Sequence, residues 1–228
     1  MNDASGLSRR HLLLGTAAAL SLQACGATAV KPTPPASGGP PVHTPPSLQP
    51  FIADCVAANR EGDRQAAVKE VLARGVADSR AMLQAVGEPT RAGITVFHRA
   101  DDLTIFSAAW TPQMNLMPHN HKMWALIGIY TGREDNIFWR RSEKGVTAHA
   151  VDVLFEGDVG ALSDTAIHSV TNPLERFTGG IHIYGGDFFA TTRSQWDPDT
   201  RQESPSDGAV IRAIFERANE RYMRTEAS

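Results

Sequence analysis

Hydrophobic and polar residues change their spacing along this chain, which indicates zones of different secondary structure. Between residues 51 and 86, starting at Phe51, apolar residues recur at roughly helical intervals among charged ones. Such spacing places the apolar side chains on one face of an α-helix. The pattern predicts a helical segment that Gly75 interrupts and that Gly87-Glu88-Pro89 ends.

From Gly93 to about Ala190 the pattern changes to short β-type runs separated by turns. We expect eight strands here: Ile94–His98, Leu103–Trp110, Met123–Tyr130, Asn136–Arg140, Val146–Leu154, Val159–Leu162, Ala166–Val170 and Ile181–Tyr184. Glu134-Asp135-Asn136 is interpreted as a hairpin turn. Many short strands at close spacing favour an antiparallel sandwich or barrel. Helical spacing returns from Gly208 to Met223 and predicts a closing helix on an all-β core.

The first 50 residues do not show the pattern of a folded domain. Ser8-Arg9-Arg10-His11-Leu12-Leu13 resembles a twin-arginine export signal, and the apolar stretch that follows is too short for a membrane span, which needs about 20 residues. We therefore expect an export signal over 1–29, a proline-rich linker over 30–50 and a folded domain over 51–228. Within that domain, residues 51–90 would form an N-terminal helical cap.

Two processing sites are compatible with the export signal. Leu22-Gln23-Ala24-Cys25 resembles a lipobox, which would lipidate Cys25 and anchor the protein to a membrane. Ala27-Thr28-Ala29 is instead a small-x-small site that would release a soluble protein. The proline-rich tether favours the anchored form. In both cases the protein is expected at the periplasmic face or in the cell envelope, with Cys55 as a free thiol.

Composition sets broad limits on the partners of this chain. It has 228 residues, 42% of them hydrophobic, a formal net charge of −3 and a pI of about 6.2. The length suffices for one globular domain with a full core. The near-neutral charge gives no indication of a nucleic-acid partner.

A histidine pair, His119-Asn120-His121, carries the clearest chemical signal. Residues two apart on a strand share a face, so both imidazoles would point the same way. Imidazole suits Fe, Zn, Cu and Ni. A third ligand is needed, and His168 in Ile167-His168-Ser169-Val170 is the best candidate.

The apolar run after the pair predicts a barrel interior. Met123, Ala125, Ile127 and Ile129 would share the face of the two histidines and form an apolar wall beside the metal. Trp124, Leu126 and Tyr130 would face the helical zone instead.

Several motifs together resemble a known superfamily. His119-Asn120-His121 with Tyr130-Thr131-Gly132-Arg133-Glu134, and Gly157-Asp158-Val159 with Ile167–Asn172, resemble the two halves of the cupin signature. Ile181–Phe189 and Arg193–Pro198 are similar to the bacterial cysteine dioxygenase family of thiol dioxygenases, which includes 3-mercaptopropionate dioxygenases. The resemblance covers roughly residues 93–205 and implies a cupin double-stranded β-helix, or jelly roll, with helices before and after it.

The composition of the site fits thiol chemistry. Most cupins add a glutamate four or five residues after the second histidine, where this chain has Ala125 and Leu126. Three neutral histidines would leave a divalent metal its full charge and open positions for a thiolate and O2. The resemblance implies Fe(II) and the oxidation of a small thiol, such as cysteine or 3-mercaptopropionate, to its sulfinate. Three imidazoles would also accept Zn or Ni.

Further site residues follow from the resemblance. It implies a second shell in which His182 orients Tyr184 near the substrate, although Gly180 stands where the family has a serine. Arg193, nine residues after Tyr184, matches an arginine that binds the substrate carboxylate in the mercaptopropionate-type members. His98, on an early strand, is a further candidate for binding the substrate.

Two other functions remain open from the sequence. One is a non-catalytic cupin that binds a small ligand or a metal, which the absence of the serine favours. The other is a cupin dioxygenase for a substrate that is not a thiol.

Overall fold

The computed structural model describes residues 39–227. The expected export signal, the Cys25 lipidation site and the linker up to residue 38 lie outside this range. The helices are η1 Pro46–Leu48, α1 Gln49–Ala58, α2 Arg64–Ala77, α3 Ser79–Val86 and α4 Gly208–Glu226. The strands are β1 Gly93–Arg99, β2 Thr104–Trp110, β3 Asn115–Asn120, β4 Ala125–Thr131, β5 Arg133–Ser142, β6 Gly145–Phe155, β7 Val159–Leu162, β8 Ile167–Thr171, β9 Thr178–Tyr184, β10 Ser194–Trp196 and β11 Glu203–Pro205.

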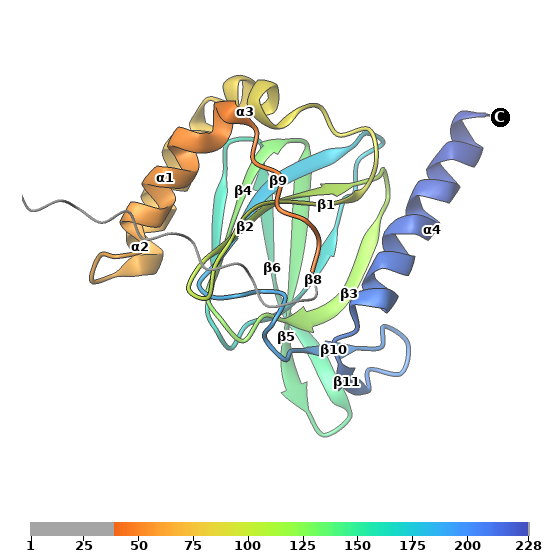
Figure 1. Cartoon of the computed structure of the whole chain (residues 1–228). Helices are drawn as coiled ribbons and strands as arrows, with labels where there is room; N and C mark the ends of the chain where they lie inside the picture. Colours follow the sequence, from red (N-terminus) through yellow and green to blue (C-terminus); the bar gives the residue numbers. More distant parts are fainter. Residues whose placement is uncertain (1–38, 228) are drawn as a thin grey trace, which may run out of the picture. The chain divides into compact units, whose positions relative to one another are not determined.

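The strands form two sheets that face each other (Figure 1). One has the order β1-β2-β9-β4-β7 and the other the order β11-β10-β3-β8-β5-β6. All pairs of these strands are antiparallel. The chain crosses repeatedly between the sheets, so that β9 lies between β2 and β4 while β8 lies between β3 and β5. This arrangement is the expected double-stranded β-helix, or jelly roll, with helices before and after it.

Alternation along β4 divides the interior into two layers. Ala125, Ile127 and Ile129 belong to the core between the sheets, as the sequence pattern predicted. Leu126 and Tyr130 belong to a second core under the N-terminal helices, which the pattern also predicted. Because successive side chains of a strand point to opposite faces, one strand serves both layers.

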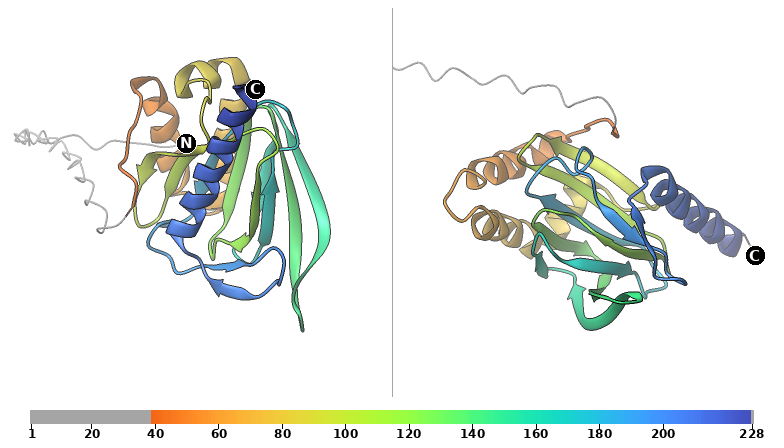
Figure 2. Two further views of the ribbon diagram at one scale, coloured as in Figure 1. Left: turned by 90° about the vertical axis from the view of Figure 1, so that its right-hand side faces the viewer. Right: turned by 90° about the horizontal axis from the view of Figure 1, so that it is seen from below.

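The N-terminal helices cover the outer face of the first sheet, where α2 packs on β4 and β7 and α3 packs on β4 (Figure 2). Asp63 and Asp78 begin α2 and α3, since each side-chain carboxylate accepts a hydrogen bond from a backbone N–H of the first turn. Gly75 does not interrupt the helical zone as expected. It lies inside α2, where a Cβ would come within 2.9 Å of the Phe51 ring, so the glycine allows α1 to pack closely. Gly87 ends α3 with a φ of 97°.

The C-terminal helix α4 lies along the other side of the two sheets (Figure 1). Phe215 and Ala218 are buried in the core between the sheets. Asn219 fixes the helix to the start of β1, because its side chain bonds both the N–H and the C=O of Ala92 at 2.7 and 3.0 Å. Within residues 39–227, no helix is long and apolar enough to span a membrane.

Several strand boundaries differ from the sequence prediction. His119 lies on a separate strand, β3, and the chain turns at Lys122, whose φ is 59°, before β4 begins. The turn after β4 is made at Gly132, where φ is 85° and a Cβ would clash with Thr178. Glu134-Asp135-Asn136 therefore forms no hairpin turn but part of β5, which is longer than predicted. The short strands β10 and β11 were not predicted.

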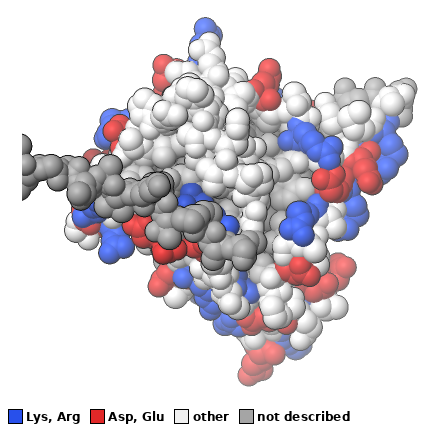
Figure 3. All heavy atoms as spheres, viewed as in Figure 1, with Lys and Arg blue, Asp and Glu red and all other residues white. Residues whose placement is uncertain are grey.

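Charges of both signs are mixed over the face of the molecule seen in Figure 3. Lysine and arginine side chains lie among aspartate and glutamate side chains, including those of α4, and neither sign gathers in a broad patch on this face.

Candidate metal centre

Three histidines from two neighbouring strands meet inside the barrel. His119 on β3 lies directly opposite His168 on β8 in the strand register, and His121 follows the end of β3. The ring centroids of the three pairs are 4.6 to 5.1 Å apart. One ring nitrogen from each residue lies within 4.8 Å of the other two. The structure thus brings together His119, His121 and His168, called here the histidine triad.

Hydrogen bonds of the outer ring nitrogens orient two members of the triad. His119 Nδ1 lies 3.0 Å from the Met117 carbonyl oxygen, and His168 Nδ1 lies 2.7 Å from Asn136 Oδ1. Both partners only accept, so each Nδ1 donates and each Nε2 keeps a free lone pair. His168 Nε2 lies 3.2 Å from His121 Nε2. The two Nε2 atoms are therefore close enough to bind the same ion.

Burial keeps the triad neutral. Each of the three side chains is at least nine-tenths buried. Desolvation lowers the pKa of His119 to about 4, against a smaller opposite effect of its hydrogen bond to the Met117 carbonyl. Desolvation, followed by the charges of neighbouring histidines, lowers the pKa of His121 and of His168 well below the ordinary value. Neutral imidazoles with free lone pairs are the form that binds metals.

The donor set fits a divalent metal. Among the described residues 39–227, the cluster of potential ligands around this point contains the three histidines and no carboxylate. His121 Nδ1 is buried without a hydrogen-bond partner, so no contact fixes the tautomer of His121, and its Nε2 can present a lone pair to an ion. The triad could therefore hold one divalent ion through three neutral nitrogens.

Tyr184 and His182 lie next to the triad on β9. The ring of Tyr184 is 4.8 Å from that of His121, and His182 Nδ1 is 3.3 Å from the Tyr184 hydroxyl. Phe106 stacks on His182 with ring centroids 5.6 Å apart. Desolvation raises the pKa of Tyr184, so its hydroxyl keeps its proton over the physiological range. At Gly180 a Cβ would come within 3.3 Å of His182 Nε2, so this glycine leaves one side of the imidazole uncovered.

A cavity of about 50 Å³ adjoins the triad. This space holds roughly three or four waters, which suits a small substrate. Its lining includes His119, His168, His182, Tyr184, Phe188 and Arg193. On the side of α4, Phe215 stacks on Trp110 with ring centroids 5.4 Å apart, so the C-terminal helix contributes to the cavity lining.

Arg193 is the cationic side chain of this cavity. Its guanidinium carbon lies 3.7 Å from the centre of the Phe188 ring, and its Nε is buried without a hydrogen-bond partner. Desolvation lowers the pKa of Arg193, against a smaller opposite effect of Tyr184. Within residues 39–227 the guanidinium forms no ion pair. An anionic group in the cavity would supply the missing partner.

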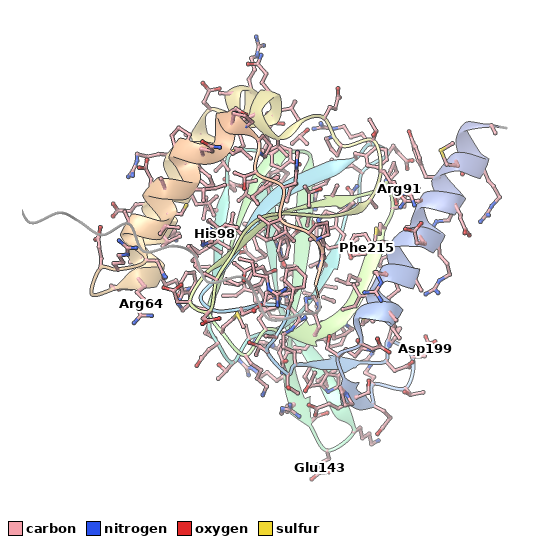
Figure 4. The ribbon with its side chains drawn as sticks, in the orientation of Figure 1. Arg64, Arg91, His98, Glu143, Asp199 and Phe215 are labelled. Atoms are coloured by element: carbon pink, nitrogen blue, oxygen red, sulfur yellow. The ribbon has the colours of Figure 1, made fainter. Side chains whose placement is uncertain are left out.

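His98 does not join these residues. It is half-buried on β1 and is not part of the cavity lining. Figure 4 shows His98 and Phe215 on opposite sides of the sheets in that view. Burial, opposed by the charge of Asp102, lowers the pKa of His98.

Sequence reasoning missed three buried residues near the triad, which are Trp110, Glu134 and Asn136. Glu134, with an exposed fraction of 0%, accepts hydrogen bonds from Trp110 Nε1 at 2.9 Å and from Asn136 Nδ2 at 3.1 Å. It also lies 3.4 Å from His182 Nε2. The available signal was the alternation of Glu134, Asn136 and Phe138, which places polar side chains on the inner face of a strand.

No protein family model matches the sequence, and no curated protein matches it. Among solved structures, a conserved double-stranded β-helix protein from Klebsiella pneumoniae is 12% identical and has a TM-score of 0.39, over 47% of this chain and 84% of its own. A cupin superfamily protein from Desulfitobacterium hafniense is 13% identical with a TM-score of 0.36, over 44% and 83%. A cupin domain from Bordetella pertussis is 17% identical with a TM-score of 0.33, over 43% and 96%. These likenesses concern the fold alone.

Proposed function

We propose that this protein is a metal-dependent thiol dioxygenase that converts a small carboxylate-bearing thiol, such as cysteine or 3-mercaptopropionate, to its sulfinate with O2. One observation carries the proposal: His119 and His168 of the histidine triad line one cavity of about 50 Å³ together with Tyr184 and Arg193, whose Nε lacks a partner. A cation-binding site and a guanidinium beside one small space fit a molecule that carries both a thiolate and a carboxylate.

The neutral triad favours a substrate that brings its own negative charge, because three imidazoles neutralise none of the charge of a divalent ion. When bound, Fe(II) would supply the redox chemistry at which thiol sulfur and O2 combine. The overall reaction joins one thiol and one O2 into one sulfinic acid. Sulfur loses four electrons and O2 gains four, and both oxygen atoms stay in the product. No further reductant is needed.

The residues of the chain bind and orient the substrate. Arg193 can hold the carboxylate with two parallel N–H···O bonds. The Tyr184 hydroxyl, fixed by His182, can donate a hydrogen bond to the reacting end of the substrate. Phe106 and Phe188 pack around Tyr184, and these apolar rings lower the local polarity, which strengthens the polar contacts beside them.

Oxygen uptake tests this proposal. The protein is reconstituted anaerobically with Fe(II) and then mixed with O2 and cysteine, 3-mercaptopropionate or a non-thiol analogue. We expect one O2 consumed for each sulfinate formed with a carboxylate-bearing thiol, and no uptake when Zn replaces Fe. Uptake with the non-thiol analogue alone would instead support a dioxygenase for another substrate class.

A non-catalytic cupin is the second candidate, and Gly180 favours it because the serine of the resembling family is absent. Such a protein would bind metal and thiol without consuming O2. The same oxygen-uptake measurement, combined with a metal analysis, separates the two functions.

We also propose that the protein is exported through the segment around Arg9-Arg10, with Cys25 as a site for a lipid anchor. Twin-arginine export carries folded proteins, so a metal could be loaded before export. Loading in the cytoplasm would protect an Fe(II) site from Cu and Zn, which bind imidazoles more tightly.

A further inference from the structure

A chain of buried hydrogen bonds connects Trp110 to the histidine triad. Trp110 Nε1 donates to Glu134 Oε2 at 2.9 Å, and Asn136 Nδ2 donates to Glu134 Oε1 at 3.1 Å. Asn136 Oδ1 in turn accepts from His168 Nδ1 at 2.7 Å. All four residues are at most 3% exposed, so water does not compete for these bonds.

Each donor in this chain fixes the direction of the next bond. Trp110 has an N–H and no acceptor on its ring, so Glu134 must accept from it. Both oxygens of Glu134 accept, which obliges Asn136 to present its NH2 group to the glutamate. The carbonyl oxygen of Asn136 is then the atom that faces His168, and His168 must carry its proton on Nδ1. Its Nε2 lone pair is thereby left free for a metal.

We propose that Glu134 is a positioning residue of the metal centre, which selects the metal-binding tautomer of His168 through the amide of Asn136. It touches neither the triad nor the cavity. The proposal rests on the metal-binding part of the proposed function alone. Since its measured quantity is metal affinity, a failure of thiol oxidation would leave it standing.

The substitution Glu134→Gln would disrupt the donor and acceptor directions of these hydrogen bonds without changing the shape of the side chain. The introduced amide has one acceptor, and Trp110 and Asn136 both present donors. In the metal-free variant this amide can accept from Trp110 and donate to Asn136, whose own amide then reverses. The reversed Asn136 presents NH2 to His168 Nδ1, and the proton of His168 moves to Nε2. To bind a metal, His168 must again carry its proton on Nδ1, and Asn136 must again donate to residue 134. The NH2 group of the introduced glutamine then faces the Trp110 N–H, so two donors oppose each other.

The first test compares metal affinities. Metal-free wild type and Glu134→Gln are titrated with Co²⁺ in the presence of a competing chelator. The visible absorption bands of protein-bound Co²⁺ report binding. We expect Glu134→Gln to bind Co²⁺ about 10- to 100-fold more weakly, as changes behind a metal ligand usually do. An unchanged affinity would overturn the proposal.

A second substitution tests the mechanism. In Trp110→Phe the indole N–H is gone, so the glutamine of Glu134→Gln can turn its NH2 group toward the phenyl ring and still accept from Asn136. The double variant Trp110→Phe/Glu134→Gln should therefore bind Co²⁺ about as tightly as Trp110→Phe alone, without the 10- to 100-fold loss. The test compares the loss of Co²⁺ affinity that Glu134→Gln causes in the two backgrounds. If the loss in the Trp110→Phe background equals the loss in the wild-type background, the role of the Trp110 donor is refuted.

Tyr130→Phe is the matched control. It also removes a buried hydrogen bond, the 2.8 Å contact between Ser107 Oγ and Tyr130 Oη, but on the face under the N-terminal helices. We expect a lower melting temperature and an unchanged Co²⁺ affinity. If Tyr130→Phe weakens Co²⁺ binding as much as Glu134→Gln does, the loss reflects general destabilisation and the proposal is wrong.

A measurement on the wild type avoids the question of whether the variants fold. Nitrogen-15 NMR distinguishes the two tautomers of a neutral imidazole. In the metal-free protein we expect His168 to carry its proton on Nδ1, and the same measurement on folded Glu134→Gln to show it on Nε2. A wild-type His168 protonated on Nε2 would overturn the proposal.

Discussion

Replacing Arg193 with methionine should remove the preference of the protein for thiols that carry a carboxylate. Methionine has a similar length and no charge, and it can keep an apolar contact with the Phe188 ring. Arg193 itself lies over that ring, with a buried Nε that lacks a partner. The substitution thus removes the proposed carboxylate partner while it largely preserves packing.

The expected magnitude follows from the bonds that Arg193 can make. A hydrogen bond to a charged group contributes about 1.5–3 kcal/mol. Loss of one such bond would lower kcat/KM for 3-mercaptopropionate by roughly 10- to 150-fold. The loss of both bonds of a bidentate pair would exceed this range. Because the cavity is small and its lining is mainly apolar, water should weaken this hydrogen bond less than at the protein surface.

The assay compares two thiols of equal length in both proteins. 3-Mercaptopropionate carries the carboxylate, and propanethiol has a methyl group in its place. Wild type should prefer the acid, and Arg193→Met should lose the preference while its kcat/KM for propanethiol changes little. Arg201→Met is the control, because Arg201 also lies over an aromatic ring, that of Trp139, but outside the cavity. A variant that loses activity equally on both thiols, or that keeps the preference, would refute this role of Arg193.

Four further outcomes are expected. His168→Ala should lower bound metal by about tenfold or more, measured by elemental analysis of protein reconstituted under anaerobic conditions, because it removes one of three ligands. Tyr184→Phe should lower turnover with little loss of thermal stability, and equal turnover would return Tyr184 to a packing role. Desolvation, with a smaller contribution from Asp54, raises the pKa of Cys55 to about 12. At pH 8 only about one thiol in ten thousand would be ionised, so alkylation of native protein should be far slower than of denatured protein. Changing Arg9-Arg10 to lysines should leave folded protein in the cytoplasm, as fractionation would show.

The fold was predictable because its signals are local. Alternation along β4 placed Ala125 and Ile127 in one core and Leu126 in the other, and the structure confirms both. The helix after Gly208 was also predicted, since its apolar residues recur at helical spacing. The structure adds that Asp207 caps its first turn.

Other features depend on contacts between distant parts of the chain. Glu134 and Asn136 look like turn residues because acidic and amide side chains favour turns. They lie in β5 because Trp110 and His168, far away in sequence, supply their hydrogen-bond partners. The break between His121 and β4 escaped prediction as well, since the apolar pattern continues across a turn made by Lys122 at positive φ.

The register that places His119 opposite His168 has a consequence for how the protein acquires its metal. His121 and His168 are separated by 47 residues, so bringing them together closes a long loop, which costs roughly 3 kcal/mol of chain entropy. An unfolded chain therefore offers only His119 and His121 as neighbours in sequence, a weak chelating pair. Strong binding must wait until β3 and β8 have paired. A metal offered early in synthesis would have little to bind, and an ion bound by the triad would be one present in the compartment where the sheets close.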